Sequence, residues 1–403
     1  MVDFFRNGGY SRRPMDEPSK PSDDELGFET RAIHAGLDYR EGTGAAIPPV
    51  FLTSTFESGN PLGFDYTRSG NPNFRNLQKT LATLEGAQHA TVFGSGVAAI
   101  TAVVSTLKSG DVVLAEENIY GCTFRLFDQV FAKFGVTIEY HDLTKFENLA
   151  LIGERKPAMV WIESPTNPLL KVIDIVAVAE ASKAAGSCLL VDNTFASSYL
   201  QRPLELGADL SLLSTTKYTN GHSDCLGGAV CSNDEAWQDK MIFAQKALGL
   251  NPSPFDTWLI SRGAKTQALR MERHSSNALA LATFLESESG APMVRYPFLP
   301  SHPQYELAKR QMRGGSGIVI ADFGLSLEKT AQFLAELKLF MRAESLGGVE
   351  SLSCHPASMT HASVPKEVRE SVGITDSLVR FSVGIETEED LIADVRQALA
   401  KVQ

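Results

Sequence analysis

The sequence predicts an α/β protein with a mostly parallel central sheet, helices on both faces of that sheet, and a smaller α+β domain at its C-terminal end. From about Arg75 onward, short apolar runs of strand length alternate with helical patterns. Each run is bounded by polar residues or glycine, as buried parallel strands usually are. After Arg262 the helical patterns lengthen and strand-like runs become fewer, which indicates a second domain.

The N-terminal stretch, up to about Asn60, is polar, rich in glycine and proline, and shows little hydrophobic period. We expect a flexible leader there, followed by an extended arm. The first helix is expected over Asn76–Glu85, because Leu77, Leu81 and Leu84 fall on one helical face.

Helical stretches such as Ile175–Ala185 lie between the apolar runs, and this βαβα order predicts parallel strands. The buried strands are expected at Val112–Ala115, Met159–Ile162, Leu189–Val191 and Leu210–Leu213.

The last part of the chain contains two long helical patterns, Thr266–Glu286 and Glu388–Val402. We therefore divide the chain into a leader and arm (1–70), a main α/β domain (71–262) and a C-terminal domain (263–403).

Composition excludes several classes of protein. The net charge of −11 argues against a nucleic-acid partner. No apolar run approaches the roughly 20 residues of a membrane span. Five scattered cysteines without a C-x-x-C pair fit free thiols in a reducing compartment, so a cytoplasmic protein is expected. No metal is predicted, because His222, Cys225 and Cys231 match no standard zinc spacing.

Three predicted strands are each followed by residues able to do chemistry. Asp192 and Thr194 follow one strand, and Ser214, Thr216 and Lys217 follow the next. The segment 163–168, with sequence ESPTNP, follows a third strand. Ligands of open α/β sheets bind beyond the carboxyl ends of the strands, so these residues are expected to meet at one site.

This set of residues fits pyridoxal phosphate. The cofactor needs a lysine for its Schiff base, an acid at its ring nitrogen and donors for its phosphate. Lys217, Asp192 and the hydroxyls of Ser214 and Thr216 supply these groups. A strand-end lysine or aspartate taken alone is more often an ordinary surface residue, so the combination carries the prediction.

A further phosphate cradle is expected at Ser95, Gly96 and Val97, in a Gly-Ser-Gly turn that leads into an Ala-rich helix. The N–H groups of Gly96 and Val97 would face an anion at the helix N-terminus. Such a turn is a weak signal by itself. It is not a dinucleotide fingerprint, since G-x-G-x-x-G fails at Ala99.

Several ordered motifs resemble the Cys/Met-metabolism class of fold-type-I pyridoxal-phosphate enzymes, over about Thr30 to Leu399. Three residues depart from the usual family pattern, and none of these departures removes a catalytic group: Val97, Asn73 and Thr215. The matching motifs lie at 66–72, 120–121, 163–168, 192–195, 214–218, 220–224, 345–348, 359–362 and 380–384.

The resemblance implies roles around the cofactor. Tyr120 would stack on the ring and Asn167 would bond its hydroxyl. Tyr66 and Arg68 would reach the cofactor phosphate of a neighbouring subunit, so a homodimer is expected as the active unit and a homotetramer as the assembly. Thr194 would be a further cofactor contact.

The resemblance also implies the substrate site and the mechanism. Arg380 would clamp the α-carboxylate of an amino-acid substrate, and Ser345 would lie close to that carboxylate and to Lys217. Lys217 would act as general base at the α-carbon. Tyr120 and Tyr66 would be the other catalytic residues, with Tyr66 helping to move protons.

The choice among activities rests on four residues. Glu344 and Asp65 would meet the distal ammonium of cystathionine, and Arg125 a distal carboxylate, although all three are equally readable as polar residues at a pocket rim. Cys122 instead favours methionine γ-lyase.

We therefore expect γ-elimination or γ-replacement in transsulfuration, by a cystathionine γ-lyase or a γ-synthase of methionine biosynthesis, and the choice between the two stays open. Methionine γ-lyase, homoserine-ester sulfhydrylase and cystathionine β-lyase are the alternatives within the family. A cofactor-binding regulatory protein and a nucleotide-binding protein are the alternatives outside it.

Overall fold

The computed structural model describes residues 26–37, 45–359 and 366–402. Most of the expected leader, and the part of the 359–362 motif formed by Thr360, His361 and Ala362, lie outside these residues. None of the helices in the described ranges has the length and apolar character needed to cross a bilayer.

The larger sheet has seven strands in the order β1-β7-β6-β5-β4-β2-β3. Strand β7 runs antiparallel to both of its neighbours, and the other pairs are parallel. The predicted mostly parallel sheet is therefore confirmed. Its strands are β1 (His89–Phe93), β2 (Val112–Glu116), β3 (Thr137–His141), β4 (Met159–Glu163), β5 (Cys188–Asp192), β6 (Leu210–Leu213) and β7 (Gly228–Ser232).

Helices cover both faces of this sheet because side chains alternate along each strand. On β2, Val113 and Ala115 point to the same face and Leu114 to the other. The first face packs against α3 (Gly96–Val104), α4 (Gly121–Gln129) and α8 (Glu235–Leu248). The second face packs against α2 (Pro72–Glu85), α5 (Ala150–Arg155), α6 (Ile175–Ala185) and α9 (Pro254–Ala264).

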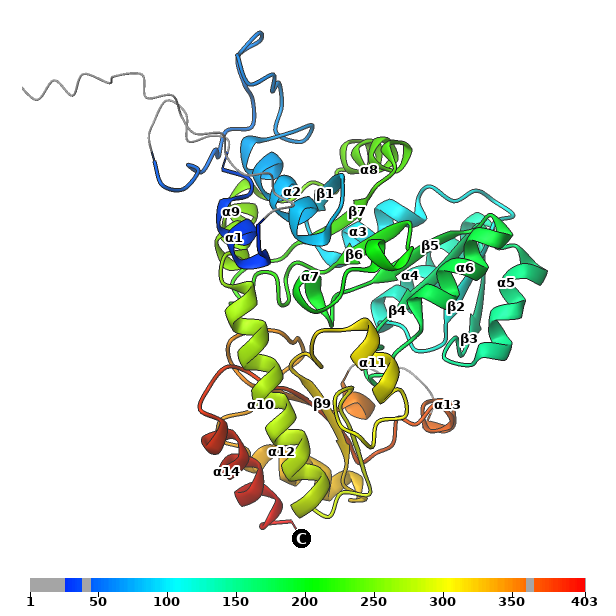
Figure 1. The fold of residues 1–403 in the computed structure, drawn as a ribbon, viewed down its shortest axis with the longest axis vertical. Helices are drawn as coiled ribbons and strands as arrows, with labels where there is room; N and C mark the ends of the chain where they lie inside the picture. Colours follow the sequence, from blue (N-terminus) through cyan, green and yellow to red (C-terminus); the bar gives the residue numbers. More distant parts are fainter. Residues whose placement is uncertain (1–25, 38–44, 360–365, 403) are drawn as a thin grey trace, which may run out of the picture.

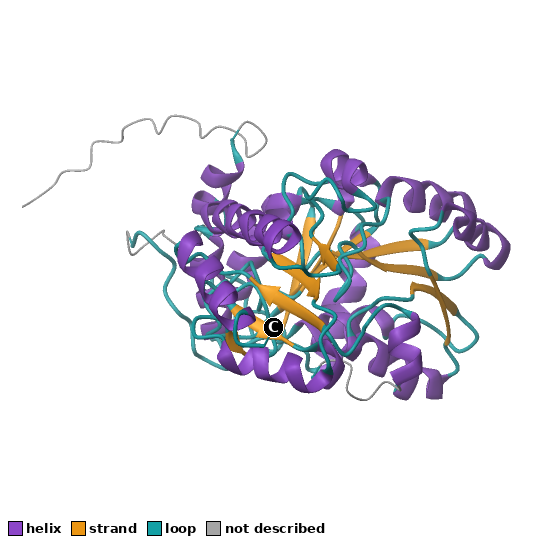
Figure 2. Cartoon of the chain, turned by 90° about the horizontal axis from the view of Figure 1, so that it is seen from below, coloured by secondary structure: helices purple, strands orange, loops and turns teal. Residues whose placement is uncertain are grey.

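The second sheet has five strands in the order β10-β11-β12-β9-β8. Figure 2 shows helices arranged around the strands. Helices α10 (Gln267–Glu288), α12 (Leu327–Glu336) and α14 (Glu388–Leu399) share one apolar core with the second sheet. The strands are β8 (Met293–Arg295), β9 (Ile318–Asp322), β10 (Met341–Arg342), β11 (Leu352–Cys354) and β12 (Leu378–Ser382).

Helix α10 joins the two halves of the molecule (Figure 1). Its first turn places Ala268 in a cluster with Phe28 and Leu84 of the N-terminal region. Its later turns place Leu281 and Leu285 in the core of the second sheet. The remaining elements are α1 (Phe28–His34), η3 (Phe131–Phe134), η4 (Phe146–Leu149), α7 (Ser197–Leu200), η5 (Pro203–Leu206), α11 (Tyr305–Gln311), η6 (Pro356–Ser358) and α13 (Lys366–Ser371).

Most of the expected elements are present, and their ends move by a few residues. The helix expected over Asn76–Glu85 is α2 and begins at Pro72, because Asn71 caps it and accepts a hydrogen bond from the Asn73 N–H at 2.9 Å. The arm is not wholly extended, since α1 lies within it. In the larger sheet, β1, β3 and β7 were not among the predicted strands. Glu139 interrupts the apolar pattern of β3, and Gly228 and Ser232 interrupt that of β7.

Candidate active site

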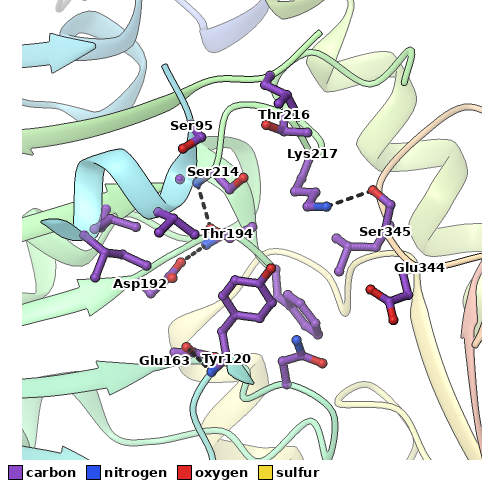
Figure 3. A pocket seen from close by; sticks show the side chains of 18 of the residues that line it. Ser95, Tyr120, Glu163, Asp192, Thr194, Ser214, Thr216, Lys217, Glu344 and Ser345 are labelled. Atoms are coloured by element: carbon purple, nitrogen blue, oxygen red, sulfur yellow. Dashed lines mark hydrogen bonds between the residues drawn. The ribbon is translucent and has the colours of Figure 1, made fainter. Parts of the chain in front are cut away.

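A cavity lies where the carboxyl ends of the central strands meet the second sheet, and Figure 3 shows its polar side chains converging. Strands β4, β5 and β6 end at its floor, and Arg380 of β12 enters from the other domain. The lining residues are Ser95, Gly96, Val97, Ile100, Tyr120, Glu163, Pro165, Asn167, Asp192, Thr194, Phe195, Leu212, Ser214, Thr216, Lys217, Leu226, Glu344, Ser345, Leu346 and Arg380.

Lys217 sits in the turn after β6, and its Nζ donates to Ser345 Oγ at 2.8 Å (Figure 3). Burial lowers the pKa of this ammonium to about 8, and the nearby Arg380 charge acts in the same direction. An amine with this pKa is more readily deprotonated than a surface lysine. It therefore suits both Schiff-base formation and proton abstraction.

The turn after Lys217 is held by a cation that the sequence analysis missed. The buried guanidinium of Arg270 donates to the carbonyl oxygens of Tyr218 at 2.7 Å and Thr219 at 3.2 Å. Gly221 leaves room for this contact, because an added Cβ would lie 1.9 Å from Arg270 Nη1. The fold therefore fixes the backbone directly after the lysine.

Two buried carboxyl groups end adjacent strands. Asp192 accepts from the Thr194 N–H at 3.0 Å, and burial raises the pKa of Asp192 to about 6. Glu163 pairs with Asp192 in the sheet register and accepts from the Tyr120 N–H at 2.6 Å. Burial, followed by the Asp192 charge, raises the Glu163 pKa well above its ordinary value. A cationic ring nitrogen beside Asp192 would favour its charged form.

The expected phosphate cradle is assembled at the start of α3. Ser95 caps this helix by accepting from the Ala98 N–H at 3.0 Å, so the N–H groups of Gly96 and Val97 belong to its open first turn. Ser214 comes so close that an added Cβ on Gly96 would lie 2.9 Å from its Cβ. This donor set fits a phosphate group.

Two hydroxyls of the cradle already have partners in the chain. Thr194 Oγ1 accepts from the Ser214 N–H at 2.9 Å. The Thr216 hydroxyl donates to the Gly227 carbonyl oxygen at 3.2 Å, so it must rotate before it can donate to a phosphate. Thr194 therefore links the ends of β5 and β6.

The Arg380 guanidinium is positioned so that it could bind an anion such as a carboxylate. Its side chain is 3% exposed, Nη1 donates to Asn167 Oδ1 at 2.9 Å, and Nη2 donates to the Ser345 carbonyl oxygen at 2.9 Å. Its buried Nε has no partner within the described part of the chain. Ser345 has a φ of 110°, a conformation that costs a non-glycine residue about 1–3 kcal/mol and that often marks functional sites.

Comparison with known proteins identifies the family. Residues 29–400 match the model of the Cys/Met metabolism PLP-dependent enzyme family. The chain belongs to this family. It is therefore a pyridoxal-phosphate-dependent enzyme, as its sequence motifs predicted, and the residues around Lys217 fit that cofactor.

Individual relatives cover nearly the whole chain. Cystathionine gamma-lyase of Dictyostelium discoideum is 46% identical, with 95% of this chain and 100% of that protein covered. Cystathionine beta-lyase of Lactococcus lactis subsp. cremoris is 44% identical, with 93% and 99% covered. A crystal structure of cystathionine gamma synthase from Xanthomonas oryzae pv. oryzae, in complex with cystathionine, superposes with a TM-score of 0.90 at 41% identity, covering 94% and 98%.

The mouth of this family member's cavity holds fewer of the expected residues than its floor. Tyr120 and Glu344 line the cavity, and burial raises the pKa of Tyr120. Arg125 and Cys122, both on α4, are not among the described residues that line it. Instead Arg125 Nη2 donates to Cys122 Sγ at 2.8 Å.

The arm residues also lie apart from the cavity of their own chain. Tyr66 is 45% exposed, and the Arg68 guanidinium lies 5.5 Å from its ring centre. Arg68 Nη1 donates to the Lys246 carbonyl oxygen at 3.0 Å, and Asp65 Oδ1 accepts from the Tyr66 N–H at 2.6 Å. One chain does not bring these three residues to Lys217.

Glu163 is the main cavity residue to which sequence reasoning gave no role. Its motif was recognised, but the contact with Asp192 depends on the pairing of β4 with β5. An acid at the last position of a predicted strand, one strand before Asp192, was the available signal.

Proposed function

We propose that this enzyme is a cystathionine γ-lyase, which cleaves cystathionine to cysteine, 2-oxobutyrate and ammonia. The observation that carries the proposal is the pair of opposite charges lining one cavity, Arg380 and Glu344. Arg380 suits the α-carboxylate of the reacting half, and Glu344 suits the distal ammonium of the other half. Relatives named cystathionine gamma-lyase, at 46–48% identity, support this choice.

The chain's own residues would bind and orient the substrate. The Arg380 guanidinium is held by Asn167 and by the Ser345 carbonyl oxygen, and its Nε has no acceptor among the residues that the structure describes. A carboxylate held there places its α-carbon near Lys217, because Ser345 contacts both Lys217 and Arg380. This positioning supplies much of the rate enhancement.

When bound, pyridoxal phosphate supplies an electron sink for the charge that develops at the α-carbon. Lys217 Nζ would accept the α-proton, and its pKa of about 8 leaves part of it unprotonated near neutral pH. Asp192 is the carboxylate that would hold the cofactor's ring nitrogen protonated. Ser95, Gly96, Val97 and Ser214 would hold its phosphate.

γ-Replacement, the cystathionine γ-synthase reaction, is the second candidate. It is favoured by the structural match to that synthase at a TM-score of 0.90. Both reactions begin with loss of a γ-substituent and need the same lysine and the same carboxylate clamp. They differ in whether a thiol or water completes the reaction.

We further propose a homodimer as the active unit, a homotetramer as the assembly and the cytoplasm as the compartment. The exposure of Tyr66, and the position of Arg68 and Asp65 outside their own cavity, support a role at a neighbour's site. The exposed Phe243 and Leu248 on nearby α8 support a contact surface there. We also propose that the chain divides into a leader and arm (1–70), a main α/β domain (71–262) and a C-terminal domain (263–403).

A product assay on the holoenzyme tests the proposed reaction. Cystathionine should give cysteine and 2-oxobutyrate. Homocysteine and pyruvate from the same substrate would instead establish a β-lyase. Cystathionine formed faster from O-succinylhomoserine and cysteine than it is cleaved would establish the synthase, and methanethiol from methionine would favour the role expected of Cys122.

A further inference from the structure

At the ends of β2 and β3, one ammonium group lies among three carboxylates. Lys171 Nζ is 2.9 Å from Glu117 Oε1, 3.2 Å from Asp142 Oδ2 and 3.8 Å from Glu116 Oε1. The side chain of Lys171 is 13% exposed and that of Glu116 is fully buried. Within the described residues these acids form the one group spaced to hold a metal ion, but Lys171 already supplies the positive charge.

The backbone of Lys171 closes the loop that carries Asn167. The Thr166 N–H donates to the Lys171 carbonyl oxygen at 2.9 Å, and the Lys171 N–H donates to Thr166 Oγ1 at 3.1 Å. Leu170, within this loop, has a left-handed φ of 57°. Because Asn167 Oδ1 accepts from Arg380, the position of this loop determines where the carboxylate clamp is held.

The acid partners of Lys171 organise the segment that leads to Tyr120. Glu116 accepts from the Asn118 N–H at 3.3 Å and from the Leu143 N–H at 2.8 Å. Glu117 Oε1 also accepts from Asn118 Nδ2 at 3.4 Å. Tyr120 follows directly after this segment and forms a wall of the cavity. Lys171 thus contacts the structures behind both the Tyr120 wall and the Asn167 wall.

We propose that Lys171 is a positioning residue, which ties the wall carrying Tyr120 to the wall carrying Asn167 and so holds the cofactor ring and the substrate clamp in register. Loss of its charge would leave three acids close together, one of them removed from water. They would separate, and the two walls would lose their common attachment. Mutation of residues that orient metal ligands commonly costs about 10- to 100-fold in affinity or activity, and we take the lower end of this range as the scale for Lys171.

The test compares Lys171→Met with Lys145→Met. Lys145 Nζ lies 3.8 Å from the same Asp142, and the Lys145 side chain is 58% exposed. Lys145→Met therefore removes the same kind of charge at a residue that does not bridge the two walls. We expect Lys171→Met to raise the dissociation constant for pyridoxal phosphate and the KM for cystathionine about tenfold each. kcat should change by less than about threefold, since bound ligands partly restore the geometry. Lys171→Arg should recover most of the loss.

Equal affinity and equal KM in Lys171→Met and Lys145→Met would overturn the proposal, whatever their thermal stabilities. If Lys171→Met does not fold, Glu117→Gln removes one side of the bridge without leaving a buried lone charge. It should raise both constants about threefold, and wild-type values for both would equally overturn the proposal.

The proposal rests on the proposed roles of Tyr120 and Asn167, and two further variants separate the two failures. Tyr120→Ala and Asn167→Ala should each weaken cofactor binding. Unchanged cofactor affinity in both variants would mean that the proposed roles fail. Weaker binding in these two variants, combined with wild-type affinity in Lys171→Met, would refute the role of Lys171 alone.

Discussion

The cavity floor and the N-terminal arm both carry residues that we propose bind the cofactor, but they differ in where their side chains find hydrogen-bond partners. On the floor, the polar groups of Asp192, Thr194 and Lys217 are hydrogen-bonded within the chain and lie close together. On the arm, Tyr66 is 45% exposed, and Arg68 contacts the Tyr66 ring and the Lys246 carbonyl oxygen of α8. Folding of one chain is therefore enough to organise the floor, whereas the proposed role of the arm requires a second copy of the chain.

The largest effect is expected from the floor. Lys217→Ala should reduce turnover by at least about 1000-fold, because the general base and the covalent attachment are both lost. The apoprotein should remain folded, since the substitution removes a buried group whose charged form is disfavoured there. Steady-state kinetics with circular dichroism check both points. Activity near the wild-type level would remove Lys217 from the mechanism.

The arm is tested by mixing two impaired proteins. If Arg68 serves the neighbour's cavity, a hybrid dimer of Lys217→Ala and Arg68→Ala subunits contains one cavity with both native residues. Equal mixing after dissociation should restore about a quarter of wild-type activity, because half of the dimers are hybrids and each has one intact site. A mixture no more active than its components would place Arg68 in its own chain's function or in none.

The charge around Lys217 predicts how apoenzyme takes up the cofactor. Only the neutral amine can attack the cofactor's aldehyde, so the capture rate should rise with pH and then level off. The midpoint of this rise should lie at the Lys217 pKa of about 8. Arg380→Gln removes a positive neighbour that disfavours the ammonium, so it should raise the Lys217 pKa and move this midpoint to higher pH. Stopped-flow absorbance measures the rate. The exposed Arg310→Gln is the control, and an equal midpoint in both variants would contradict this electrostatic account.

The smallest effect is one of stability. Burial raises the pKa of Asp192 to about 6 from 3.8, so the folded apoprotein binds an extra proton between these values. Its contribution to stability is therefore favourable at low pH and is lost as the pH rises through about 6. Asp192→Asn should stabilise the apoprotein by roughly 1–3 kcal/mol at pH 8 and by much less at pH 4. Urea unfolding at both values measures this. Equal changes would show that the Asp192 charge is not the cause.

Sequence reasoning found the parts of the site that are local in the chain. Lys217 and Ser214 follow β6 within a few residues, and Asp192 ends β5, so strand prediction alone brings them to one edge of the sheet. The family motifs gave Asn167, in a strand-end segment, its specific role, and they added Arg380, which no local pattern marks as functional. The site thus follows from short apolar runs and from motif order.

The parts that were missed depend on contacts between distant residues. The role of Glu163 follows from its register with Asp192. The Lys217–Ser345 contact spans 128 positions and was expected from the family motifs alone. The contact of Arg270 with the lysine turn, made from the start of α10, was not expected. The ion pairs of Lys171 could not be predicted from the sequence, because its acid partners come together only when β2 pairs with β3.

The most direct test of the central claim is to find where the cofactor is attached. Purified holoenzyme would be reduced with borohydride and digested, and its pyridoxyl-bearing peptide would be sequenced by mass spectrometry. The account predicts that the label lies on Lys217, in the peptide that follows β6, and that it is absent from Lys217→Ala. A label on another lysine, such as Lys171 or Lys246, or no label at all, would contradict it.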